Sequence, residues 1–165
     1  MTKLIVNPEE IKEIFFDAIL NGYARPSSEK KSIPHFPNSK VTRYRTDLWL
    51  VIDAWTTNPD TGHSFGSTCI YHKGTLPVWF MQYSGIYPKS LTWFLKEALK
   101  ENYKNRRFTG GRGPFQFEPK DNPRLLYTNN VNCSGFIQFN GREDIKQNGI
   151  LEGYHIYNGG LMIKP

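Results

Sequence analysis

Three arginines interspersed with glycines form the most suggestive chemical pattern in this sequence. Arg106 and Arg107 stand just before the segment TGGRG, which contains Arg112. A glycine-rich turn can present several backbone N–H groups to one phosphate, and guanidinium groups bind phosphate through paired hydrogen bonds. The pattern therefore indicates an anion-binding site at these three arginines. The ordinary alternative is a loop that only connects a helix to the next strand.

Aromatic residues extend this predicted site. Trp55, Tyr83 and Tyr157 lie in strand-like segments, and His63 lies in a polar turn. Rings on an open sheet face, next to arginines, stack on nucleotide bases and on single-stranded nucleic acid. Because 15% of the residues are aromatic, most rings must fill the core, but a few on the far face are enough for binding. The complete predicted ligand site is Arg106, Arg107, Arg112, Trp55, His63, Tyr83 and Tyr157.

Asp53 and His63 are the candidates for acid–base catalysis. Asp53 interrupts an apolar strand, VIDAW, and a carboxyl group that faces a cleft can have a raised pKa and act as a base. The alternative is that Asp53 lies on the solvated face of an alternating strand. The sequence contains no nucleophile elbow, no phosphate-loop signature and no Ser-His-Asp order, so no catalytic residue is assigned from a motif.

No metal or cofactor is expected. The histidines show no metal-ligand spacing and no Cys-x-x-Cys pair occurs. Cys69 and Cys133 are predicted to be reduced structural thiols, because a secreted scaffold usually carries more cysteines. The sequence has no apolar run near the ~20 residues that span a bilayer, and no signal-peptide core near its start. We therefore expect a cytoplasmic protein without a membrane partner.

The charge balance gives a weaker indication of partners. A net charge of +6 at pH 7 favours anionic molecules such as nucleotides, nucleic acid or acidic proteins. A chain of 165 residues is expected to form one domain, 1–165. The oligomeric state is not indicated.

Two helices are predicted. The first begins after Asn7, a favourable N-cap residue, with Pro8 at its first position, and Gly22 ends it. The second runs from about 88 to 103. Both carry apolar residues at the spacing of one helical face. The proline-rich segment 25–38 is expected to be a loop.

Strand patterns account for most of the remaining chain. The predicted strands are 41–44, 48–55, 67–72, 78–83, 124–128, 135–139, 143–146 and 153–157. Residues 56–63 and the pair Lys73 and Gly74 are predicted turns. Two Asn-Gly pairs, at 140–141 and 148–149, are strong short-range hairpin signals.

The two halves of the sequence resemble each other. A shift of 80 residues superposes the helices, including Tyr23 on Tyr103, and a shift of 75 superposes glycines, including Gly66 on Gly141 and Gly85 on Gly160. The alternative is a chance alignment in a glycine-rich chain. The pattern predicts pseudo-repeats at about 7–86 and 87–162. The predicted fold is α+β, with two tandem helix-plus-antiparallel-strand repeats that form one twisted sheet and place two helices on one face.

The segments NGYA, KGTLPVWFMQYSG and GYHIYNGGL also carry a family resemblance. The chain resembles a family of uncharacterised bacterial domains, some of which follow a Cro-type helix-turn-helix. The matching positions are Tyr23, Ala24, Gly74, Pro77, Val78, Trp79, Met81, Tyr83, Gly85, Tyr157, Gly159 and Gly160. The chain departs from the pattern in lacking glycines after Ala24 and in lacking a helix-turn-helix. The resemblance implies an accessory sensing or binding domain.

Three functional hypotheses follow. The leading one is a non-enzymatic binding or sensing domain for an anionic small molecule, such as a nucleotide. The second is a small hydrolase or transferase that uses Asp53 or His63 in a cleft, which requires these side chains to converge. The third is a protein- or nucleic-acid-binding inhibitor that acts through the open sheet face.

Overall fold

The computed structural model describes residues 6–21 and 30–164. Within them the chain runs through helices α1, η1 and α2 and strands β1 to β8. The bounds are α1 (Pro8–Asn21), β1 (Ser39–Arg45), β2 (Trp49–Thr57), β3 (His63–His72), β4 (Leu76–Ile86), η1 (Lys89–Leu91), α2 (Thr92–Lys104), β5 (Gln116–Phe117), β6 (Leu125–Ser134), β7 (Gln138–Gln147) and β8 (Ile150–Leu161). The predicted helix end at Gly22, the resemblance at Tyr23 and Ala24, and residues 25–29 lie outside the described residues.

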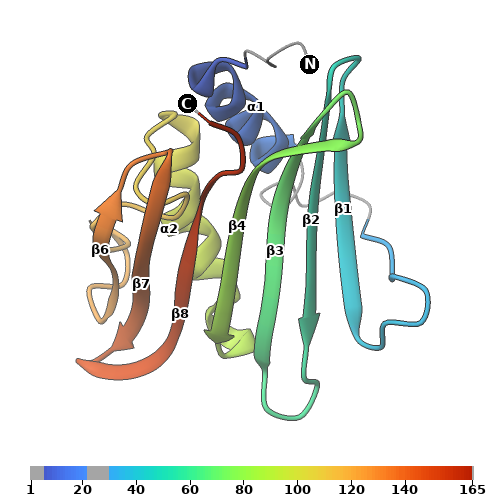
Figure 1. Ribbon diagram of the computed structural model, residues 1–165. Coiled ribbons are helices and arrows are strands. Elements are labelled where there is room, and N and C mark those ends of the chain that lie inside the picture. The colour runs from blue at the N-terminus through green and yellow to red at the C-terminus, as the bar shows by residue number, and fades with distance from the viewer. Residues whose placement is uncertain (1–5, 22–29, 165) are drawn as a thin grey trace.

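The strands form one antiparallel sheet. Their order is β1-β2-β3-β4-β8-β7-β6-β5, so each half of the chain contributes a meander and the last strands of the two meanders pair at the centre. Tyr83 of β4 lies opposite Tyr157 of β8. Both α-helices lie on the same side of this sheet (Figure 1). The predicted α+β class is confirmed, whereas the tandem repetition of the sequence stays a prediction.

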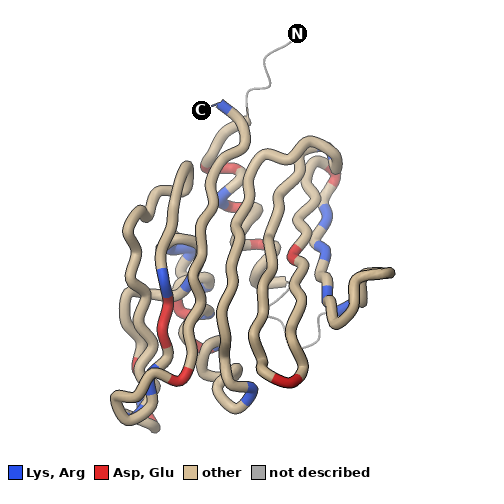
Figure 2. The backbone as a smooth tube through the Cα atoms, turned by 60° about the horizontal axis from the view of Figure 1, so that its bottom comes forward, with Lys and Arg blue, Asp and Glu red and all other residues tan. Residues whose placement is uncertain are grey.

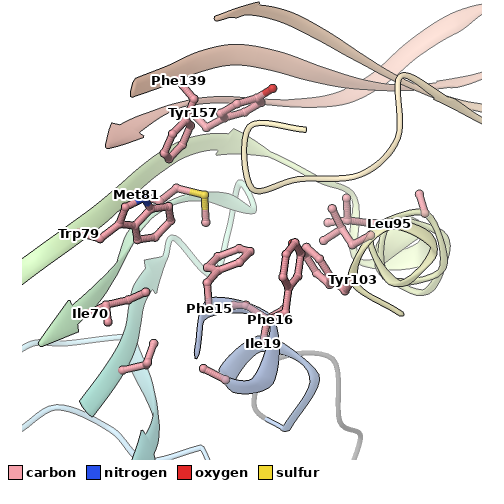
Figure 3. Packing of buried hydrophobic residues seen from close by; sticks show 14 of the residues in the cluster. Phe15, Phe16, Ile19, Ile70, Trp79, Met81, Leu95, Tyr103, Phe139 and Tyr157 are labelled. Carbon is pink, nitrogen blue, oxygen red and sulfur yellow. The ribbon is translucent and has the colours of Figure 1, made fainter. Parts of the chain in front are cut away.

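The helix-covered face holds the core. Phe15 of α1 packs against Trp79 of β4 and Tyr103 of α2, with ring centroids 5.2 and 6.2 Å apart, as Figure 3 shows from close by. Asn7 caps α1, since its Oδ1 accepts the backbone N–H of Glu9 at 3.0 Å. The second helix begins with a 3₁₀ turn, η1, before α2. In the described residues no helix is long and apolar enough to cross a membrane.

One of the two Asn-Gly pairs forms the predicted turn and the other does not. Asn148 and Gly149 have φ of 52° and 79° and connect β7 to β8. Asn140 and Gly141 lie inside β7, so the predicted turn between the strands 135–139 and 143–146 is wrong, and residues 138–147 form one continuous strand. The physical reason is that Gly141 accommodates a ring, because a Cβ there would lie 2.7 Å from Cζ of Tyr157.

The same close approach occurs in the first half of the chain. A Cβ on Gly66 of β3 would lie 2.7 Å from Cζ of Tyr83. Each glycine therefore lets a central tyrosine lie flat across the neighbouring strand. This packing turns both tyrosine hydroxyl groups toward the helix-covered face, where they enter the polar network described below.

Replacement of Gly141 by alanine tests this packing. We expect Gly141→Ala to lower the free energy of unfolding by about 1–3 kcal/mol, because the added methyl group overpacks the contact with Tyr157. Urea denaturation measures the change. Asn130→Ala, at an exposed residue of β6, is the control and should change stability by less than about 0.5 kcal/mol. A Gly141→Ala protein as stable as the wild type would contradict the interpretation.

Candidate binding groove and buried polar network

The sheet face away from the helices is hollowed over its central strands. Side chains alternate along each strand, so Ala54, Ser67 and Gln82 point away from the helices, whereas their neighbours Asp53 and Thr68 point toward them. Two adjoining hollows, of about 650 and 540 Å³, lie on this open face. They share four wall residues, namely Thr56, Phe65, Ser84 and Ile156. We call the two hollows together the open-face groove.

The open-face groove is uncharged. Among the described residues that line it there is no Lys, Arg, Asp or Glu. Strands β3 and β4 contain no such residue at all, and the central strands are mostly tan in Figure 2. The positive charge gathers instead on β1, with Lys40, Arg43 and Arg45, where basic side chains protect an edge strand from pairing with another sheet. The net charge of the protein therefore says little about this groove.

Aromatic and aliphatic side chains are exposed in the groove. Phe65 is 54% exposed, Ile156 51% and Phe36 45%. The rings of Phe36 and Phe65 meet edge to face, with centroids 6.4 Å apart. Large apolar side chains grouped on an exposed, hollowed surface mark a place where another molecule binds.

The helix-covered face carries a buried polar network. Arg112 and Glu143 form an ion pair, with Nε of Arg112 donating to Oε1 of Glu143 at 2.9 Å. Tyr127 donates its hydroxyl proton to Oε2 of Glu143 at 2.6 Å and accepts the backbone N–H of Gly113 at 3.0 Å. These contacts fix the glycine-rich loop 109–113 against β6 and β7.

The two central tyrosines occupy equivalent places in this network. Tyr83 donates its hydroxyl proton to Asp53 at 2.9 Å, and Tyr157 donates to Asn129 at 2.5 Å. Asn129 in turn donates to the backbone carbonyl groups of Thr109 and Gly113 at 3.1 and 2.9 Å. The network therefore joins the centre of the sheet to the loop.

Burial and ion pairing set the protonation states of the carboxyl groups. Burial by itself would raise the pKa of Glu143, but Arg112 outweighs it and the pKa is lowered, so Glu143 is ionised at neutral pH. Burial raises the pKa of Asp53, against the opposing effect of hydrogen bonds from Tyr83 and Thr68. Among the described residues, Arg112 is the cation that pairs with Glu143, and His155 would add a second one only if it were protonated.

His155 lies beside the ion pair as a neutral imidazole. Burial, helped by the charge of Arg112, lowers its pKa to about 4. Its Nε2 lies 3.3 Å from the hydroxyl oxygen of Ser64. Its Nδ1 lies 3.9 Å from Oε1 of Glu143 and makes no hydrogen bond within the described part of the chain. His155 is therefore a structural group whose protonation is disfavoured by burial.

The structure does not bring the three predicted arginines together. Arg112 is 7% exposed and is bound by Glu143. Arg106 pairs with Glu13 and Asp17 of α1, at 2.6 Å each, and Arg107 is exposed. The sequence could not show these partners, because the acidic residues come from distant segments of the chain.

The other predicted site residues lie closer to the groove. Trp55, Tyr83 and Tyr157 border the first hollow and His63 borders the second, although the hydroxyl groups of both tyrosines belong to the buried network. Asp53 and His63 are not brought together. Asp53 accepts from Tyr83 and Thr68, whereas Nδ1 of the exposed His63 lies 3.2 Å from Oγ1 of Thr61.

The exposed rings and amide side chains that line the groove are not among the site residues predicted from the sequence. These are Phe36, Phe65, Gln82, Asn132, Asn140 and Asn158. The available signal was the alternation of small or polar residues along β3 and β4, which indicates that one face of those strands lacks an apolar cover. No sequence pattern near Arg112 or Glu143 predicts that they pair, because they are 31 residues apart in the chain.

Comparison with known proteins places the chain in a family. Residues 61–162 match the family model described as a domain of unknown function (DUF5680), and because this range is more than half of the 165 residues, the chain belongs to that family. This agrees with the resemblance to uncharacterised domains, whereas a bacterial origin and a helix-turn-helix neighbour stay predictions. No curated protein and no solved structure matches the chain.

Removal of one partner from the buried ion pair should be costly. We expect Glu143→Leu to lower the free energy of unfolding by about 3–5 kcal/mol, because the charge of Arg112 stays buried without its partner. The double variant Arg112→Met, Glu143→Leu should recover a large part of that loss. Arg106→Met, at an exposed pair, is the control and should cost less than about 1 kcal/mol. Urea denaturation measures the free energy of unfolding of each variant. If the loss in the double variant equals the sum of the losses in Arg112→Met and Glu143→Leu, the two side chains are not coupled and the interpretation is wrong.

His155 should make stability depend on pH. Its pKa is about 4 in the folded protein and near 6.5 when unfolded, so between these values the unfolded chain binds the extra proton. Stability should therefore fall as the pH drops from 6.5 to 4, by up to about 3 kcal/mol from this group. His155→Gln should lack this part of the slope when urea denaturation is repeated across the range. Parallel pH profiles for the two proteins would contradict the assignment.

Proposed function

We propose that this member of the family is a non-enzymatic binding domain whose ligand lies in the open-face groove. The ligand carries a flat ring together with uncharged hydrogen-bonding groups. The observation that carries the proposal is a hollow of about 650 Å³ on the uncovered sheet face, free of charged lining residues and with Phe65 exposed within it. Sites of this kind are concave and combine apolar surface with a few polar groups.

The exposed rings account for the flat part of the ligand. Phe65 and Phe36 form a small aromatic platform at the edge of the first hollow. A sugar ring or a nucleobase has a face that stacks on such a platform. Ile156 adds apolar contact next to it, two strands away from Phe65 across β4.

The amide and hydroxyl side chains account for the polar part. Gln82, Asn140 and Asn158 each present a donor and an acceptor to the groove. Ser67 and Ser84 add hydroxyl groups between them. An anionic ligand would leave its charge uncompensated here, and so the sequence-based preference for an anion is not part of the proposal.

Binding is favoured over catalysis by the partners of the acid–base candidates. Asp53 is buried on the opposite face of the sheet from the groove and is held by Tyr83 and Thr68. His63 borders the second hollow without a carboxylate partner among the described residues. A hydrolase or transferase built on these two side chains has no shared substrate position.

We also infer that the two halves of the chain arose as a tandem repeat. Support comes from the matching glycine–tyrosine contacts, Gly66 with Tyr83 and Gly141 with Tyr157. The hairpins β3–β4 and β7–β8 add support, since each has a shift in register near its turn, at Ile70 and at Ile145. The repetition places the groove across the junction of the two halves.

Replacement of Phe65 tests the proposed function. Neutral nucleosides and methyl glycosides are titrated against the protein, with binding followed by tryptophan fluorescence, because Trp55 borders the groove. For a compound that binds, we expect Phe65→Ala to weaken affinity about tenfold through loss of stacking. Phe115→Ala is the matched control, because Phe115 is exposed but does not line the groove.

The same titration separates a neutral ligand from an anionic one. Addition of a 5′-phosphate to the nucleoside should change affinity by no more than about twofold, and salt should have little effect. A tight, salt-sensitive gain from the phosphate, or full affinity in Phe65→Ala, would contradict the proposal.

A further inference from the structure

A row of neutral polar side chains crosses the open-face groove at right angles to the strands. Ser67 of β3 lies opposite Gln82 of β4, Gln82 lies opposite Asn158 of β8, and Asn158 lies opposite Asn140 of β7. Asn132 continues the row onto β6, at the place where the β6–β7 register shifts. We call these five residues the amide row.

The amide groups of this row are not used by the protein itself. Gln82, Asn132 and Asn158 are exposed and Asn140 is half-buried. Within the described part of the chain, no side-chain hydrogen bond involves any of the four. Asparagine is disfavoured in strands, and the donors and acceptors of these amides are open to a ligand on the hollowed face.

The spacing of the amide row restricts what can bind along it. Neighbouring strands lie ~4.8 Å apart, so the row spans about 19 Å from β3 to β6 in steps of that length. An extended peptide repeats every ~3.3 Å, so its residues cannot each lie over a successive strand of the row. A single-stranded nucleic acid carries a phosphate charge on each nucleotide, which this groove does not neutralise. The step is close to the length of one pyranose unit in an extended β-1,4-linked chain.

We propose that the groove binds a neutral oligosaccharide that lies across the strands, an inference that rests on the proposed function. Successive sugar units lie over successive strands, and their hydroxyl groups pair with the donors and acceptors of the amide row. Phe65 lies next to the row, one place along β3 from Ser67 on the same face, where its ring contacts the apolar face of a sugar. Arg142, on the same face of β7, pairs with Asp144 at 2.7 Å and lies over the ring of Tyr154, which borders the second hollow.

The inference is tested with neutral oligosaccharides of increasing length. Isothermal titration calorimetry is run on the full chain with the series from cellobiose to cellohexaose and with the equivalent N-acetylglucosamine series. An oligogalacturonate of matched length supplies a charged counterpart, and adenosine supplies a ring without a sugar chain. We expect affinity in one neutral series to rise up to about five units, one for each strand of the row, and then level off, with little change between low and high salt and weaker binding of the oligogalacturonate.

Two matched variants locate the binding. Asn158→Leu should weaken oligosaccharide binding at least about fivefold through the lost hydrogen bonds. Asn130→Leu introduces the same change at an exposed asparagine of β6 that does not line the groove, and should bind like the wild type. Circular dichroism checks that both variants are folded.

Each outcome decides between the claims. Length-dependent binding that is lost in Asn158→Leu supports the inference. Binding of adenosine that depends on Phe65, with no binding of either neutral series, overturns the inference and leaves the proposed function standing. Oligosaccharide binding that is equal in Asn158→Leu and Asn130→Leu, or that does not vary with length, also overturns it. Failure of every neutral probe overturns both.

Discussion

The buried ion pair between Arg112 and Glu143 is the interaction on which the arrangement of this protein depends. A guanidinium and a carboxylate taken out of water are tolerated only with each other and with further hydrogen bonds, here from Tyr127 and the loop backbone. Because the pair lies on the helix-covered face, it draws the glycine-rich loop inward. The loop thereby becomes part of the interior of the protein, with Arg112 buried in it.

This arrangement gives the two faces of the sheet different chemistry. One face contacts both helices and the loop, and it holds the aromatic core and the polar network. The other face is not covered by the helices, and the groove on it is lined by small and amide side chains together with the exposed Phe65 and Ile156. The central tyrosines connect the two, because they pack closely against Gly66 and Gly141, donate to the buried network and also border the first hollow. The two tyrosines therefore belong both to the buried network and to the wall of the proposed binding groove.

Local features of the fold could be predicted from the sequence, whereas the features that depend on distant pairing could not. Asn7 capped the first helix and Asn148 with Gly149 formed a hairpin, because these signals act over a few residues. Asn140 and Gly141 have the same local pattern, yet the ring of Tyr157 keeps them within a strand. Tertiary packing outweighed turn propensity there.

The candidate site was predicted less well for the same reason. Trp55 and His63 do border the groove. Arg112 is predicted to bind a ligand, because the spacing of residues in the sequence does not reveal its buried partner Glu143. The amide row depends on the registers between β3, β4, β8 and β7. Those registers place side chains next to each other that are far apart in the chain, and alternation alone does not say which face the helices cover.

The most direct measurement is a map of where a bound ligand contacts the protein. Backbone amide signals in a two-dimensional ¹H–¹⁵N NMR spectrum can be followed while a neutral oligosaccharide or nucleoside is added. We expect the amide signals of Phe65, Gln82 and Asn158 to shift and those of residues 106–113 to stay unchanged. Shifts centred on that loop, with the open face unaffected, would contradict it.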